Sequence, residues 1–115
     1  AANLSARDNA MTDGPGTQAG DAIGPMINMA AVDKINRHVE DALAKGATIV
    51  TKSPALPEGP QYVAPLVLTG ATKEMQLAGE ETFGPVAPLF RFETEEEAIA
   101  LANGTPYGLA SYFYT

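Results

Sequence analysis

The strongest hydrophobic pattern in the chain runs through residues 28–46. Large aliphatic side chains recur there at the spacing of one helix face: Val32, Ile35, Val39 and Leu43. Asn28 stands directly before this pattern as a candidate N-cap, and Gly46 follows it at a position where helices commonly end. The pattern therefore predicts an amphipathic helix over residues 29–45.

Four apolar segments have the composition of strands: residues 47–51, 62–70, 86–92 and 108–115. Pro65 lies within the second segment and cannot donate a ladder hydrogen bond, so we expect an edge strand or a bulge there. The three prolines of residues 51–61 predict a surface loop. A short helical turn is expected at residues 72–77.

Thr94 and Glu97 have the spacing of a capping box and predict a helix that ends at residues 103–104. This helix joins the segments 86–92 and 108–115, and the whole unit has the length of a right-handed βαβ crossover. Those two strands should then be parallel. The predicted fold class is therefore α/β, with a mostly parallel sheet and flanking helices.

Length and composition narrow the class of protein. A chain of 115 residues has the size of one domain, and 45% hydrophobic residues with 18% charged ones are typical of a globular protein. The formal net charge of -7 argues against nucleic acid and anionic lipid as partners. No apolar run approaches the roughly 18 residues that span a bilayer, so we expect a cytoplasmic protein with no membrane partner.

Residues 1–22 differ from the rest of the chain. They are rich in Gly, Thr, Asp and Pro and show no apolar period, which predicts a poorly ordered or loop-like lead-in to a domain over residues 23–115. Such a beginning suggests a chain cut from something longer. The chain also contains no cysteine, which excludes a disulfide, a thiolate metal site and a cysteine nucleophile within it.

Several smaller motifs have ordinary structural explanations. The Gly-rich residues 14–20 follow no strand and lack the Gly-Lys-Ser/Thr of a phosphate-binding loop. His38, the only histidine, has no second ligand or acid four residues later, so we expect a solvated helix residue and no metal site. The acidic residues 93–97 suit the first turn of a helix. Strand packing is the simplest role for the aromatic side chains without basic neighbours: Tyr107, Tyr112, Phe113 and Tyr114.

Residues 80–85, Glu-Glu-Thr-Phe-Gly-Pro, are the most specific candidate site. Their carboxylates could be solvated turn residues, with Phe83 filling the local core. Alternatively, Glu81 could accept two hydrogen bonds from a sugar diol while the ring of Phe83, two residues later, lies against a planar heterocycle. Pro85 fixes its own φ angle and Gly84 permits a close backbone approach, so the loop could hold both groups rigidly.

The stretch EETFGPVAPLFRF at residues 80–92 resembles the E-x-F-G-P segment of aldehyde dehydrogenases. Three further stretches resemble the same family in the same order: IGPMIN at 23–28, HVEDALAKGATIV at 38–50 and EEEAIALANGTPYGLASYFYT at 95–115. Together they cover about residues 19–115, whereas residues 1–18 match poorly. APLFRF and GLASYFYT look most like the succinate-semialdehyde dehydrogenase branch.

This resemblance implies part of the catalytic domain of an enzyme that oxidises an aldehyde with NAD or NADP. In such enzymes a cysteine thiolate attacks the aldehyde, hydride passes to the nicotinamide, and a glutamate-activated water hydrolyses the thioester. By position, Glu81 would bind the nicotinamide-ribose hydroxyls and Phe83 would back the nicotinamide ring. The nucleophile and the dinucleotide-binding domain have no counterpart in this chain, so we assign no catalytic residue and expect no activity from the chain alone.

The resemblance also implies a small aldehyde as the substrate of the parent enzyme, and apolar surface left uncovered should favour a homo-oligomer. The main alternative is a free-standing α/β interaction domain. Its aromatic terminal strand, residues 108–115, would recruit a partner through unpaired backbone groups.

Overall fold

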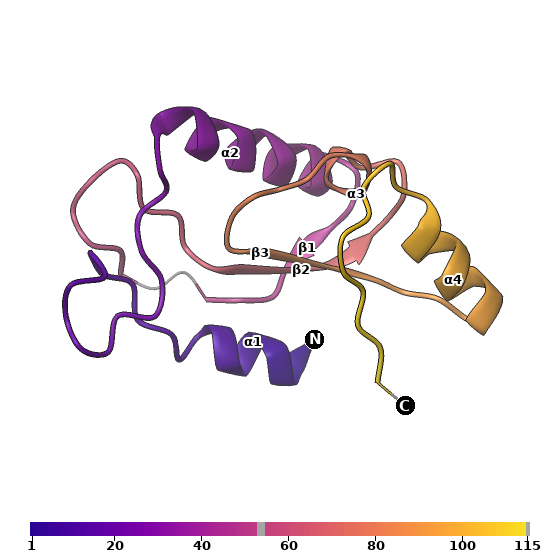
Figure 1. Cartoon of the computed structure of the whole chain (residues 1–115), viewed down its shortest axis with the longest axis horizontal. Helices are drawn as coiled ribbons and strands as arrows, with labels where there is room; N and C mark the ends of the chain where they lie inside the picture. Colours follow the sequence, from indigo (N-terminus) through magenta and orange to yellow (C-terminus); the bar gives the residue numbers. More distant parts are fainter. Residues whose placement is uncertain (53–54, 115) are drawn as a thin grey trace.

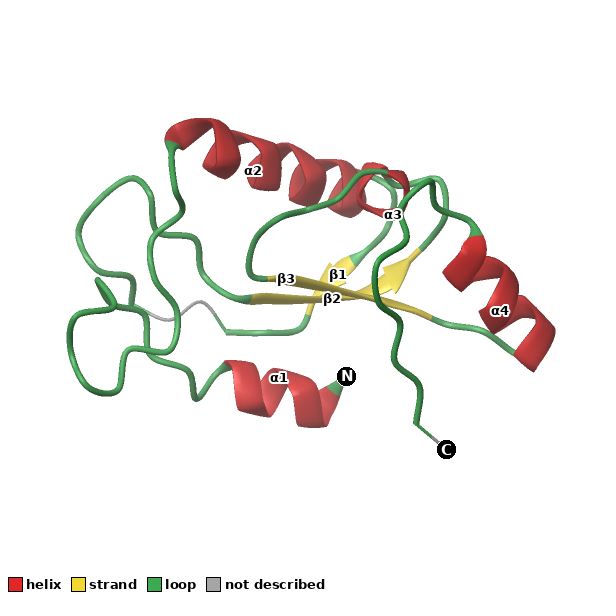
Figure 2. Cartoon of the chain, in the orientation of Figure 1, coloured by secondary structure: helices red, strands yellow, loops and turns green. Residues whose placement is uncertain are grey.

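In the computed structural model, which describes residues 1–52 and 55–114, three strands form one mixed sheet in the order β1-β2-β3. They are β1 (Thr48–Ile49), β2 (Leu66–Ala71) and β3 (Val86–Phe90). β1 runs antiparallel to β2, and β2 runs parallel to β3 (Figure 2). The sheet thus combines one antiparallel and one parallel pair and is flanked by helices, and the predicted α/β class is confirmed.

Within the described part of the chain, four helices accompany the sheet: α1 (Ala2–Asp8), α2 (Met29–Ala44), α3 (Gln76–Gly79) and α4 (Glu95–Asn103). Figure 1 shows α2 and α3 together on one side of the sheet and α1 on the other. α3 begins four residues later than the helical turn that we expected at residues 72–77. No helix of the described residues is both long enough and apolar enough to cross a membrane.

The ends of α2 follow from the sequence signals that predicted it. Asn28 accepts a hydrogen bond from the backbone N–H of Ala31 at 2.9 Å, and Gly46 has a φ angle of 98° that an L side chain rarely adopts. Four residues on one face are buried against the sheet and the loop before β3: Val32, Ile35, His38 and Ala42. The predicted helix at residues 29–45 is therefore confirmed.

The main hydrophobic cluster lies between α2 and the sheet and includes Ala42, Leu68 and Met75. Ile35, Val67, Leu68 and Met75 each have at most 2% of their surface exposed, and Val67, which precedes Leu68 on β2, points to the opposite face of the sheet. Burying one aliphatic side chain of this size stabilises the fold by roughly 1.5–3 kcal/mol. The core therefore depends most on β2 and on the segment just before α3.

β2 is the central strand, so the prediction of an edge strand or a bulge at Pro65 was wrong. Pro65 lies just before the ladder, where its missing N–H is not needed. The irregularity lies instead at Gly70, because Thr69 pairs with Leu89 and Ala71 pairs with the next residue, Phe90. Gly70 has a φ angle of 73°, which explains why glycine occupies the extra position.

The predicted strand at residues 108–115 is not formed by the described residues 108–114, and Thr115 lies outside them. The expected parallel partner of β3 is therefore absent there, and the parallel pair is β2 with β3. The aromatic side chains expected to pack in a strand are mostly exposed: 57% for Tyr107, 83% for Tyr112, 87% for Phe113 and 95% for Tyr114. A strand is stabilised by hydrogen bonds to the backbone of a neighbouring strand. α4 buries no residue, and it does not place the segment after it against the sheet.

Residues 1–22, which we expected to be loop-like, begin with α1. Ser5 is buried and its hydroxyl donates to the carbonyl of Val50 at 2.7 Å, while Asn9 Oδ1 accepts from the N–H of Lys52 at 2.8 Å. These two contacts attach α1 to the segment after β1. The expected surface loop at residues 51–61 includes residues 53–54, which lie outside the described residues.

Candidate functional site

The candidate loop, residues 80–85, connects α3 to β3. Glu80 ends α3 with extended backbone angles of φ -118° and ψ 137°, and its N–H donates to the carbonyl of Gln76 at 2.8 Å. At the other end the N–H of Leu66 donates to the carbonyl of Pro85 at 2.8 Å, which extends the β2–β3 pairing by one position. The loop is thus held at both ends by backbone hydrogen bonds.

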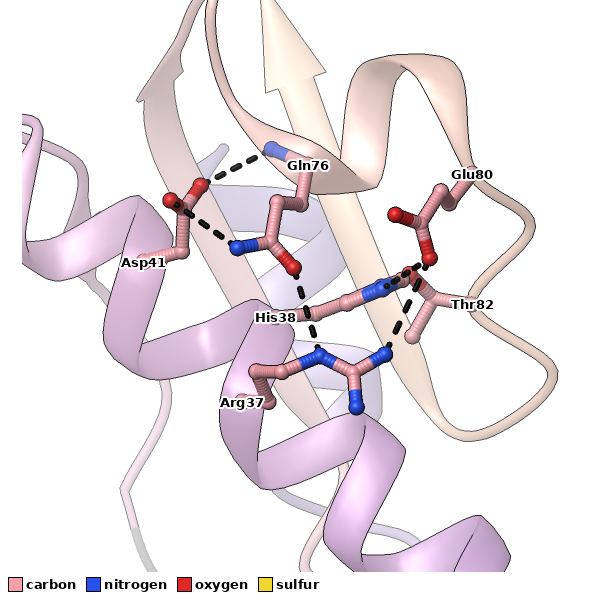
Figure 3. A network of polar contacts seen from close by, with 6 residues as sticks. All are labelled: Arg37, His38, Asp41, Gln76, Glu80 and Thr82. Atoms are coloured by element: carbon pink, nitrogen blue, oxygen red, sulfur yellow. Dashed lines mark hydrogen bonds and ion pairs between the residues drawn. The ribbon is translucent and has the colours of Figure 1, made fainter.

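His38 connects the middle of this loop to α2. Its side chain is fully buried, with Nδ1 2.7 Å from Thr82 Oγ1 and Nε2 3.2 Å from Glu80 Oε2 (Figure 3). A carboxylate only accepts hydrogen bonds, so in the neutral imidazole Nε2 carries the proton and Nδ1 accepts from the Thr82 hydroxyl. The expectation of a solvated His38 was wrong, because both ring nitrogens have partners that allow burial.

A second group of polar contacts surrounds the exposed side of the same helix. Arg37 donates from Nε to Gln76 Oε1 at 3.3 Å, and its Nη2 lies 3.8 Å from Glu80 Oε2. Asp41 Oδ2 accepts from the backbone N–H of Gln76 at 2.8 Å (Figure 3). Asp41 Oδ1 also pairs with Lys45. The hydrogen bonds from Lys45 and from the Gln76 N–H hold the pKa of Asp41 below its ordinary value. These contacts fasten α3 to α2.

Gly84 forms the third link between the loop and α2. A Cβ atom added to Gly84 would lie 2.4 Å from Cδ1 of Ile35 and 3.6 Å from Cε of Met26. A side chain at this position would therefore require Ile35 or the loop to shift. The close approach that we expected Gly84 to permit is an approach to this protein's own core.

The two predicted cofactor contacts lie between these anchors. Glu81 is exposed and lines a hollow of about 1140 Å³ between α3, β3 and α4, whose walls include Leu77, Phe90 and Leu101. Phe83 has 78% of its surface exposed and lies outside the lining of that hollow. Unlike Glu80, Glu81 makes no side-chain hydrogen bond or ion pair within residues 1–52 and 55–114. Both side chains are thus free to contact another molecule.

The structure adds one residue that sequence reasoning missed. His38 stands three residues after Ile35 and four before Ala42, and all three are buried on the same face of α2. Its position in the apolar period was therefore a usable signal of burial. What the sequence did not reveal is that residues 80 and 82 lie opposite it, because this contact joins positions more than forty residues apart.

The remaining motifs provide no second site. Asp21 Oδ2 accepts from the N–H groups of Gly16 and Gln18, so the backbone donors of the Gly-rich loop already have an anionic partner. Among the described residues no three His, Cys, Asp or Glu side chains come close enough to hold a metal ion. Thr94 Oγ1 accepts from the N–H of Glu97 at 3.2 Å, and the N-cap of the capping box is confirmed.

Comparison with known proteins identifies the family. The model of the aldehyde dehydrogenase family matches residues 1–115. Two curated relatives are 3-sulfolactaldehyde dehydrogenase of Pseudomonas putida, 47% identical over the whole chain, and mitochondrial succinate-semialdehyde dehydrogenase of Rattus norvegicus, 48% identical over 89% of it. The chain spans 24% and 20% of their lengths. The match includes residues 1–18, so the view that they fit the family poorly was wrong.

Solved structures agree with the sequence comparison. Succinate-semialdehyde dehydrogenase from Burkholderia pseudomallei superposes on 99% of this chain with a TM-score of 0.91 and 50% identity, and the chain covers 24% of it. Betaine aldehyde dehydrogenase from Staphylococcus aureus, solved in complex with NAD+, covers 94% of this chain with a TM-score of 0.82 and 35% identity, and the chain covers 22% of it. Sequence and fold thus agree, and the chain belongs to the aldehyde dehydrogenase family.

Proposed function

We propose that this chain supplies the nicotinamide-ribose contact of an NAD- or NADP-dependent aldehyde dehydrogenase. Glu81 would accept hydrogen bonds from the two ribose hydroxyls, and the ring of Phe83 would lie against the nicotinamide. The observation that carries the proposal is the contrast within one loop. The side chains of Glu80 and Thr82 bond to His38 of α2, and Gly84 lies against Ile35. Glu81 and Phe83 lie between these contacts with exposed side chains, and Glu81 makes no side-chain bond within residues 1–52 and 55–114.

The exposed groups suit a nicotinamide nucleotide chemically. An ionised carboxylate presents only acceptor oxygens, which match the two donor hydroxyls of a ribose diol. An exposed aromatic ring offers a flat apolar face to a planar heterocycle. When bound, the nicotinamide supplies a hydride acceptor. The residues of this chain bind and orient it, and a rigid loop reduces the entropy lost when the reactants are aligned.

For the substrate we propose succinate semialdehyde, which the parent enzyme would oxidise to succinate. Both the Rattus norvegicus relative and the Burkholderia pseudomallei structure are succinate-semialdehyde dehydrogenases. The Pseudomonas putida relative acts on 3-sulfolactaldehyde, another small aldehyde that carries an anionic group. An anionic aldehyde is therefore the substrate class that these relatives favour.

The chain by itself should have no dehydrogenase activity. It contains no cysteine, so no thiolate is available to attack an aldehyde. Succinate semialdehyde and NAD+ or NADP+, mixed with the purified 115-residue chain, should form no NADH or NADPH above the rate without protein. Aldehyde-dependent absorbance of the reduced nucleotide would overturn this part of the proposal.

Nucleotide binding tests the assignment of Glu81 and Phe83 directly. Two charge-assisted hydrogen bonds and one ring contact barely exceed the entropic cost of association, so the affinity should be no tighter than about millimolar. Titration with NAD+, followed by two-dimensional NMR, should shift the amide signals of Glu81 and Phe83. Glu81→Gln should weaken these shifts, whereas Glu58→Gln, at an exposed position elsewhere, should not. Equal shifts in both variants would rule out the carboxylate contact.

Self-association is a second expectation that the exposed side chains support. Leu109 is fully exposed, and the aromatic residues on either side of it are more than half exposed. Apolar surface of this kind favours assembly into dimers or larger oligomers. A monomer at all concentrations in analytical ultracentrifugation would contradict it. The alternative of an interaction domain with an aromatic edge strand loses support, since residues 108–114 form no strand.

A further inference from the structure

One buried imidazole holds both neighbours of Glu81. His38 bonds to the side chain of Glu80 on one side of this residue and to the side chain of Thr82 on the other (Figure 3). The imidazole is completely buried, whereas the carboxylate of Glu80 that it contacts is half exposed. The direction of the intervening residue is therefore set by a contact that Glu81 itself does not make.

The same alternation continues one step further along the loop. Gly84 packs against Ile35, which lies one helical turn before His38 on α2. Residues 80, 82 and 84 thus all contact α2. Glu81 and Phe83, which lie between these contacts, have exposed side chains that a ligand can reach.

We propose that His38 is the positioning residue of this loop, which fixes the direction of Glu81 and Phe83 toward a nicotinamide nucleotide. The inference rests on the proposed function, because it assigns His38 a role toward the cofactor that Glu81 and Phe83 would contact. His38 acts through Glu80 and Thr82 and touches no ligand itself.

Arg37 is the other side chain that reaches Glu80, but its contact is weaker. Its Nη2 is 3.8 Å from the carboxylate, and both side chains are half exposed, at 56% and 50%. Exposed ion pairs of this length are screened by solvent and contribute little. The neighbouring positions Arg37 and His38 therefore provide a matched comparison between an exposed contact and a buried one.

The first measurement concerns the loop alone. The N–H groups of Glu80 and Val86 donate to the carbonyls of Gln76 and Gly84 and are therefore protected from exchange. In His38→Leu, which fills a similar volume without polar atoms, amide hydrogen exchange at Glu80 and Val86 should accelerate roughly tenfold as both side-chain bonds are lost. Thr82→Val removes one hydroxyl and should accelerate it about threefold, while Thr82→Ser and Arg37→Gln should remain within about twofold of the parent chain. Exchange at Leu68, in the core of β2, serves as the reference for global opening.

The second measurement concerns the nucleotide. The binding of NAD+ is measured from the NMR shifts of Glu81 and Phe83. Thr82→Val should weaken this binding about threefold, and Thr82→Ser should restore it. If Thr82→Val weakens binding while exchange at Leu68 stays the same, and Thr82→Ser restores binding, then a general loss of stability is not the cause. If His38→Leu does not fold, the Thr82 pair still decides the question.

The outcomes separate the two proposals. If the parent chain shows no NAD+-dependent shifts at Glu81 and Phe83, the proposed function fails whatever the exchange rates are, and the cofactor role of His38 fails with it. If the parent chain binds but Thr82→Val binds equally well, only the inference about His38 fails. Unchanged exchange at Glu80 and Val86 in both Thr82→Val and His38→Leu would likewise overturn the inference and leave the proposed function intact.

Discussion

Gly84 lies against Ile35 with no room for a side chain between them, since an added Cβ would come within 2.4 Å of Ile35 Cδ1. Gly84→Ala should therefore destabilise the chain by about 1–3 kcal/mol, the usual effect of overpacking a filled core. Urea denaturation followed by circular dichroism measures the change. Gly24→Ala is a matched control, because Gly24 also precedes a proline but has no atom within 4 Å of the added Cβ. Equal losses in the two variants would contradict the contact.

The N-cap of α2 should contribute measurably to stability. Asn28 Oδ1 accepts from the N–H of Ala31, so Asn28→Ala leaves a helix donor without its partner and should cost about 1 kcal/mol. Asn28→Ser can make the same hydrogen bond and should lose much less. Urea midpoints of the two variants provide the measurement. A serine variant as unstable as the alanine one would show that capping is not the cause.

Asp41 should make stability depend on pH in the acid range. The hydrogen bonds from Lys45 and from the Gln76 N–H lower the pKa of Asp41 below its ordinary value of 3.8. A lowered pKa in the folded state stabilises the fold above pH 3.8, and this contribution is lost as the pH falls below 3.8 through the folded-state value. The stability difference between the parent chain and Asp41→Asn should therefore shrink on acidification. A stability difference that stays constant on acidification would exclude ionisation of Asp41 as its cause.

Asp13 should have the opposite effect. Burial, and to a smaller extent the charge of Asp8, raises the pKa of Asp13 above its ordinary value of 3.8. Within the described residues its two carboxylate oxygens are buried without a hydrogen-bond partner. Because the folded state then binds the proton more tightly, stability falls as the pH rises above 3.8. Asp13→Asn should be more stable than the parent chain at neutral pH, and its advantage should disappear on acidification. An advantage independent of pH would exclude ionisation as the cause.

Local sequence signals predicted much of the fold because they act over short distances. Asn28 and Gly46 mark the ends of α2, and Thr94 marks the beginning of α4, since capping depends on residues within one turn. The motif at residues 80–85 was recognised in the same way. The strand predicted at residues 108–115 is not formed by the described residues 108–114. Their composition suits a strand, but no neighbouring strand of the described residues pairs with them.

The sequence by itself determined the α/β class, the ends of the long helix and the identity of the candidate loop, because each depends on neighbouring residues or on a contiguous motif. Only the tertiary structure decided that His38 is buried and that it holds Glu80 and Thr82 on either side of Glu81. It likewise decided that Gly84 must be small because of Ile35. These contacts join α2 to a loop more than forty residues later, and no local pattern specifies which side chains meet across the core.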